Sequence, residues 1–204
     1  MTEHVLTSHS VEDFFDGALR SALGNQGIDA SPDTVHYVVR VLCAFSRSDR
    51  LYEQTEHGYG LRPLALLYAD AAYSTDAATR FHALQRLGDV ALFIAGLFSH
   101  SLNRKLVDVD YYVAMGGSAY GALSSAPKTM ARSARCAVFA ELSRKFAEFV
   151  DALAEVGQDA NFNNDSDLLR SYELWLRTGS RRAAQQLRRA GIQPTDTNIS
   201  RWRH

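Results

Sequence analysis

The residues best suited to chemistry cluster on one predicted helix and on the start of another. The stretch TRFHALQRLGDVALFIAGLF carries His82, Arg86 and Asp89 in its first half. Tyr111 and Tyr112 follow in the first turn of a later predicted helix, beside a face of small residues. Such tyrosines either line a pocket or pack in the core with their hydroxyls at its rim. These five residues are the candidate ligand-binding set, with a pocket expected between 76–99 and 110–125.

Asp89 stands out because it lies where an amphipathic helix becomes apolar on all sides. From Val90 onward no polar side chain interrupts the run until Ser99, which is typical of a helix surrounded by protein. A buried carboxylate without partners is costly, so Asp89 should be paired or hydrogen-bonded. The partner is expected to be a cation or the N-terminus of another helix. The alternative is a carboxylate that serves a ligand or a reaction.

No spacing in the chain predicts a metal site or a known catalytic motif. His82, Asp89 and His100 project in similar directions, but seven residues of helix separate the first two by about 10 Å, whereas one helix chelates a metal with residues three or four apart. The stretch 115–121, MGGSAYG, matches neither G-x-S-x-G nor G-x-G-x-x-G, and no predicted strand precedes it. We therefore predict no metal, no cofactor and no catalytic residue, while enzymatic activity remains open.

Charge is distributed unevenly along a chain whose net charge is −1. Residues 1–102 hold seven basic and twelve acidic residues, whereas 103–204 hold fifteen and eleven. Four arginines flank one short predicted helix near the C-terminus, and they form the second candidate set: Arg181, Arg182, Arg188 and Arg189. Such a cluster is typical of a solvated face that docks on acidic protein surface, here or on a second subunit. The alternative is contact with nucleic-acid phosphates, for which only weak binding is expected.

The elements that must position these residues are predicted to be helices throughout. Cap residues precede apolar runs of helical period, as at Ser10 and at Ser31-Pro32-Asp33, and glycines follow them. No alternating strand pattern occurs, and 48–62 is predicted to be a loop. The longest helix is expected from Pro127 to Val156. The expected helices are 10–23, 32–45, 63–72, 76–99, 110–125, 127–156, 166–178 and 180–190. The fold class is therefore all-α, a single-domain bundle of about seven helices around a buried central helix, 76–99.

Domain organisation and compartment follow from composition. Residues 1–192 are expected to form one helical domain, in which 157–167 is a linker before a basic subregion, 168–190, and 193–204 is a frayed tail. The longest apolar run is far shorter than the about 20 residues that span a membrane. The N-terminus lacks the pattern of a signal peptide. Two cysteines, Cys43 and Cys136, do not form a disulfide framework. A cytoplasmic protein without membrane contact is expected.

Three segments resemble parts of an uncharacterised family of bacterial all-helical proteins. They are RLGDVALFIAGLF (86–98), DVDYYVAMGGSAYGAL (108–123) and YELWLRTGS (172–180). The resemblance covers about 35–192 and implies a helical fold. It implies no activity, cofactor or catalytic residue.

Three functional hypotheses follow from these observations. The leading one is a non-enzymatic regulatory or adaptor protein that acts through protein–protein contacts, as a homodimer, because apolar helix faces exceed what one small bundle needs. The second is a small-molecule-binding helical protein or enzyme with a pocket between 76–99 and 110–125. The third is a nucleic-acid-binding protein that uses the arginine-rich C-terminus.

Overall fold

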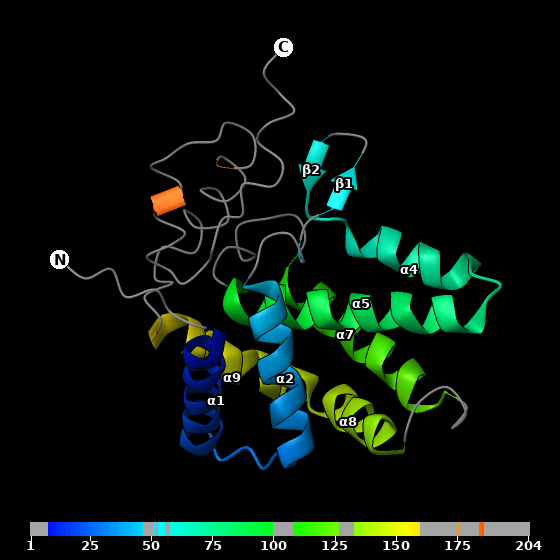
Figure 1. Ribbon diagram of the computed structural model, residues 1–204. Coiled ribbons are helices and arrows are strands. Elements are labelled where there is room, and N and C mark those ends of the chain that lie inside the picture. The colour runs from blue at the N-terminus through cyan, green and yellow to red at the C-terminus, as the bar shows by residue number, and fades with distance from the viewer. Residues whose placement is uncertain are drawn as a thin grey trace.

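The fold is an all-α bundle of packed helices, seen in a computed structural model (Figure 1). The structure describes residues 8–46, 51, 53–55, 58–99, 108–126, 133–159, 175 and 184–185. Within these residues there are seven helices and one short hairpin. The helices are α1 (Ser8–Asn25), α2 (Pro32–Phe45), α4 (Leu64–Tyr73), α5 (Ala77–Leu97), α7 (Val109–Ser124), α8 (Ser133–Arg144) and α9 (Phe146–Asp159). The strands are β1 (Glu53–Thr55) and β2 (Gly58–Gly60).

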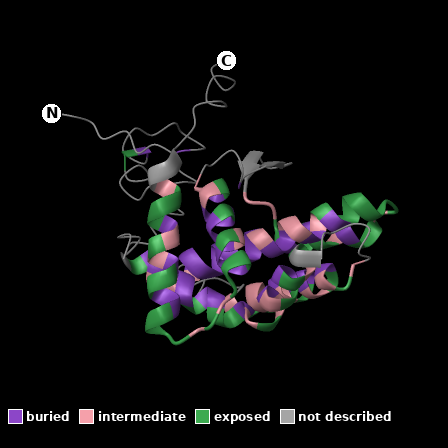
Figure 2. Cartoon of the chain, turned by 60° about the horizontal axis from the view of Figure 1, so that its bottom comes forward, coloured by how far each residue is buried: buried purple, intermediate pink, exposed green. Residues whose placement is uncertain are grey.

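The central helix is α5, as its sequence predicts. Every residue from Val90 to Phe98 is buried, and α5 packs against α7, α9 and α4. Figure 1 shows α5 lying across the bundle, and Figure 2 shows buried positions along its centre and exposed ones on the outer helix faces. Because neighbours surround it, α5 needs no polar stripe in its second half.

Helix starts are set by short polar side chains, although not always the predicted ones. The Ser31 side chain accepts a hydrogen bond from the Thr34 amide and caps α2, as expected. Asp76 and Asp108 cap α5 and α7, so these helices begin at Ala77 and Val109 and not at the predicted 76 and 110. After α1 the chain turns at Gly27, with φ 66°, where a left-handed backbone favours glycine. The helix predicted over 10–23 therefore continues to Asn25, two residues further.

Residues 53–60 contain a small antiparallel hairpin where a loop is predicted. Glu53 pairs with Gly60, Gln54 with Tyr59 and Thr55 with Gly58. The two glycines that suggested a loop are part of the strand pairing. Three pairs are too few to show the alternation by which strands are recognised, and they leave the fold class unchanged.

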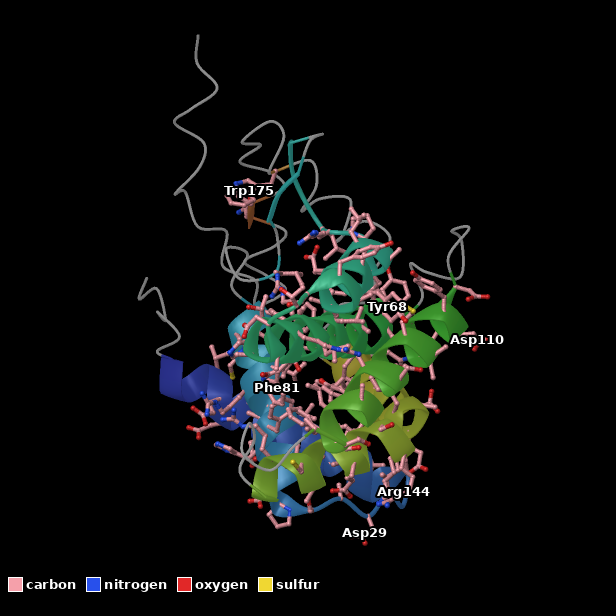
Figure 3. The ribbon with its side chains drawn as sticks, turned by 90° about the vertical axis from the view of Figure 1, so that its right-hand side faces the viewer. Asp29, Tyr68, Phe81, Asp110, Arg144 and Trp175 are labelled. Atoms are coloured by element: carbon pink, nitrogen blue, oxygen red, sulfur yellow. The ribbon has the colours of Figure 1, made fainter. Side chains whose placement is uncertain are left out.

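The predicted helix from Pro127 to Val156 is two helices, α8 and α9, separated by Lys145. The start of that prediction lies outside the described residues. Backbone bonds continue across the bend, from the Lys145 amide to Glu141 and from the Phe149 amide to Lys145. Tertiary contacts hold the bend: the Lys145 ammonium donates to the Asp29 carbonyl, and Phe146 packs against Gly116. Figure 3 shows Asp29 and Arg144 at this same end of the molecule.

The C-terminal region is described at only three positions. Trp175 and Ala184 are buried, and Gln185 is exposed. Helix α9 continues to Asp159, so the predicted linker at 157–167 begins within a helix. The basic subregion and the tail otherwise lie outside the described residues. Among the described helices, none is both long and apolar enough to cross a membrane.

Candidate functional site

The polar centre of the bundle is a carboxylate held by two tyrosines from two other helices. The hydroxyls of Tyr37 on α2 and Tyr120 on α7 both donate to Oδ1 of Asp89 on α5, each at 2.7 Å. Gln85 lies one turn earlier on α5, and its amide donates to the Tyr37 oxygen at 3.0 Å. Among the described residues, none donates to the second oxygen, Oδ2. The arrangement joins three helices through one oxygen atom, and we call Tyr37, Gln85, Asp89 and Tyr120 the Asp89 cluster.

Burial controls the protonation of this cluster. It raises the pKa of Asp89 from 3.8 to about 6, although the two tyrosine hydroxyls and the charge of Arg86 oppose the rise. Burial and the neighbouring carboxylate raise the pKa of Tyr37 and Tyr120 as well. Both tyrosines therefore remain donors, and Asp89 is the group that changes charge near neutral pH.

Arg86 lies beside the Asp89 cluster, but its guanidinium contacts Leu51 and Phe45. Its guanidinium donates to the Leu51 carbonyl at 3.0 Å and lies 5.0 Å from the centroid of the Phe45 ring. This geometry is a cation–π contact together with a backbone hydrogen bond. Of the predicted ligand set, Arg86 and Asp89 are thus near one another, and Arg86 also anchors the chain around Leu51.

The other three predicted residues lie apart from Asp89. Helices α5 and α7 are antiparallel, since Gly88 meets Tyr120 and Ala91 meets Gly116. The first turn of α7 therefore faces the end of α5, about 20 Å along the axis from His82. His82 is exposed, whereas Tyr111 and Tyr112 are half-buried and pack edge-to-face with centroids 5.9 Å apart. These five residues do not form one site.

Sequence reasoning found Asp89 but not the residues that bind it. The need for partners follows from a carboxylate beside an apolar run, yet the expected partner was a cation or a helix N-terminus. Tyr120 belongs to the glycine-rich stretch that matched no motif, and Tyr37 lies 52 residues from Asp89. Gly88 is the residue in the sequence that is linked to the Tyr120 contact, because a Cβ at position 88 would lie 2.7 Å from the Tyr120 ring. The missing side chain makes room for the ring, so that its hydroxyl reaches Asp89 one residue away.

A second carboxylate, Glu141 on α8, makes the helix N-terminus contact that was expected of Asp89. Its oxygens accept from the Ser31 amide at 3.2 Å and from the Thr34 hydroxyl at 2.7 Å. Burial raises the pKa of Glu141, but the bonds from Ser31, Thr34 and Lys145 outweigh it and bring the pKa to about 2. The carboxylate remains charged at the positive end of α2 and joins α8 to that helix.

A shallow groove lies between α5 and α7, where the sequence predicted a pocket, but other residues line it. Its volume is about 260 Å³, and Leu84 in its lining directly precedes Gln85 of the Asp89 cluster. Its floor is formed by the buried side chains of Phe81, Leu84 and Leu123. Alanines and the exposed Arg80 form the rim. Phe81, labelled in Figure 3, also contacts Phe139, whose ring stacks on Tyr120, so groove and cluster share a wall.

The remaining predictions concern metals and arginines. No group of three or more histidine, cysteine or acidic residues in the described parts of the chain could hold a metal ion. The four candidate arginines, Arg181, Arg182, Arg188 and Arg189, lie outside the described residues. Ala184, in the helix predicted between them, is buried.

Comparison with models of protein families, with curated proteins and with solved structures found no match. The resemblance to an uncharacterised bacterial family remains a prediction from the sequence.

Proposed function

We propose that the protein is a non-enzymatic regulatory or adaptor protein that acts through protein–protein contacts and pairs with a second copy of itself through α4. The observation that carries this proposal is the outer face of α4. Leu66 and Tyr73, seven residues apart on the same side of the helix, are exposed there at 50% and 85%, and Tyr68 is exposed at 54% on the flank of the helix. Tyr68 lies on α4 at the opposite end of the molecule from Asp29 and Arg144 (Figure 3).

The sequence of α4 differs from that of an ordinary surface helix. Leu64, Leu67 and Ala71 are buried against the bundle, and the other helix positions are apolar apart from Asp70. A surface helix normally carries charged or polar residues on its outer face, and one that is apolar all round is normally covered. The outer face of α4 therefore has the composition of an interface.

The charge of this face is compatible with a second copy as the partner, and its area sets the strength of the pairing. The carboxylate of Asp70 is 2.6 Å from the guanidinium of Arg62, so the face carries one neutralised pair and no net charge that would repel its own copy. With about 200 Å² for each large side chain, the exposed parts of Leu66, Tyr68 and Tyr73 amount to roughly 400 Å² per copy. Two copies would bury roughly 800 Å², less than the about 1,200 Å² of stable interfaces. The dimer is accordingly reversible and concentration-dependent.

The test is light scattering behind size exclusion over a concentration series. The native chain should approach twice 22.6 kDa as concentration rises. Leu66→Lys/Tyr73→Lys should remain monomeric, because a pairing face cannot bury four ammonium groups. Phe14→Lys is the matched control: Phe14 is 48% exposed but lies on α1, and its change should leave the dimer intact. A native chain that is monomeric at every concentration, or a dimer that survives the double substitution, contradicts the proposal.

The nucleic-acid alternative depends on arginines outside the described residues and stays a prediction. It requires log affinity to fall with log salt by about 0.9 for each phosphate neutralised on duplex DNA. We expect at most weak binding, and the fluorescence anisotropy of labelled duplexes at two salt concentrations tests this.

A further inference from the structure

The groove between α5 and α7 has the chemistry of a binding site with one charged end. Its floor is apolar and buried, formed by Phe81, Leu84 and Leu123. Its rim is open because Ala77, Ala122 and Ala126 are small. Its volume of about 260 Å³ equals that of about nine water molecules at about 30 Å³ each. This is slightly below the size of pockets for drug-sized ligands, so only a small molecule fits.

Arg80 supplies the charge. Among the described residues it is the one charged residue that lines the groove, and it has no ion pair or side-chain hydrogen bond with any of them. A guanidinium offers several donors in a planar fork that matches a carboxylate. The buried apolar floor favours a ligand with an apolar body, and the unpaired guanidinium favours a carboxylate. Together they favour a molecule that carries both an apolar body and a carboxylate.

Nearby polar groups do not cancel this charge by direct contact. Asp76, one turn before Arg80, is occupied as the N-cap of α5, where it accepts from the Thr79 amide at 2.7 Å. At the end of α7, the negative end of that helix, the Gly121 carbonyl accepts from the Ser124 hydroxyl at 2.7 Å. The N-terminal turn of α5 forms the other wall, and it is the positive end of its helix.

The geometry points to a binding site for a small apolar monocarboxylate in the groove between α5 and α7, with its apolar body on Phe81, Leu84 and Leu123 and its carboxylate on Arg80. This site is separate from the α4 face, because its described lining residues come from α5, α7 and Ala126 and none comes from α4. It therefore does not depend on the proposed dimer. Binding there is expected to be weak, since one wall is open to solvent.

The probe is octanoate, with octanol and octylammonium as uncharged and oppositely charged counterparts of the same chain. Isothermal titration should show one octanoate per chain, and octanol and octylammonium should bind at least about tenfold more weakly, since one charge-assisted contact is lost. Arg80→Gln should weaken octanoate binding by about tenfold. Arg40→Gln, at an exposed arginine on α2, is the matched control and should bind as the native chain does. Ala122→Phe should abolish binding, because its ring fills the groove from an exposed position.

Four results would overturn the assignment. Equal binding of octanol and octanoate would show an apolar surface without a carboxylate site. Native affinity in Arg80→Gln, or no binding of octanoate to the native chain, would show that the groove is not the site. Loss of binding in Leu66→Lys/Tyr73→Lys would place the ligand on α4 instead. The oligomeric state of each variant, measured in parallel, separates failure of this site from failure of the dimer.

Discussion

Replacing Asp89 with asparagine should stabilise the protein at neutral pH and leave its stability unchanged in acid. Asparagine keeps the oxygen to which Tyr37 and Tyr120 donate. The amino group of the asparagine takes the place of Oδ2. It meets no competing donor among the described residues, because none of them donates to Oδ2. The substitution therefore preserves both hydrogen bonds and removes only the charge.

The magnitude follows from the raised pKa. A folded-state pKa of about 6, against 3.8 for the free side chain, makes ionisation in the folded protein cost about 3 kcal/mol at 1.36 kcal/mol per pKa unit. Because the pKa is raised, the favourable contribution is complete below pH 3.8 and is lost as pH rises through about 6. Asp89→Asn avoids this loss, so its advantage should grow from near zero at pH 4 to as much as about 3 kcal/mol at pH 8.

Urea unfolding of both proteins from pH 4 to pH 8 measures this difference directly. Subtraction cancels the contributions of other titrating groups, including Glu141, whose lowered pKa gives the opposite dependence on pH. Asp89→Ala is the informative counterpart, because it removes the same charge but leaves two hydroxyls without their acceptor. It should therefore be less stable than Asp89→Asn by about 1–3 kcal/mol at every pH. An Asp89→Asn advantage that does not change with pH, or a variant less stable than the native chain at pH 8, would refute the reasoning. Equal stability of Asp89→Ala and Asp89→Asn would show that the two hydroxyl bonds do not hold the helices together and would favour a ligand role.

Three further predictions concern packing, capping and fold class. Gly88→Ala should destabilise by about 1–3 kcal/mol in urea, because the new Cβ lies 2.7 Å from the buried Tyr120 ring, whereas Gly17→Ala, with nothing within 4 Å, should stabilise slightly. Glu141→Ala should lower the melting temperature at pH 7 and lose that effect in acid, because the lowered pKa makes its contribution complete above 4.5 and lost as pH falls through about 2; equal melting-point differences at pH 7 and pH 2 would contradict this. Far-UV circular dichroism should show more than about half helix, well above the average of about one third, and a dominant β signal would be incompatible with the fold.

The sequence was sufficient for properties that depend on neighbours along the chain. The cap at Ser31, the all-round apolar half of α5 and the helical class are local patterns with the period of a helix, and the structure confirms them. The sequence of α5 also contains small residues, among them Gly88 and Gly96, which allow a neighbour to approach closely. What approaches Gly88 and Gly96, however, is a side chain, Tyr120 or Leu153, and not a neighbouring backbone.

Tertiary structure alone decided which residues meet at each polar site. Burial beside an apolar run shows that Asp89 requires donors, but the order of residues does not show which helices approach it. Tyr37 and Tyr120 lie 52 and 31 residues from Asp89 and reach it only because α2 and α7 cross α5 at that level. The same limit explains why His82, Tyr111 and Tyr112 were grouped with Asp89. The sequence predicted that these residues lie on two helices. Only the packed bundle shows that the two helices are antiparallel, which places His82 far from Tyr111 and Tyr112.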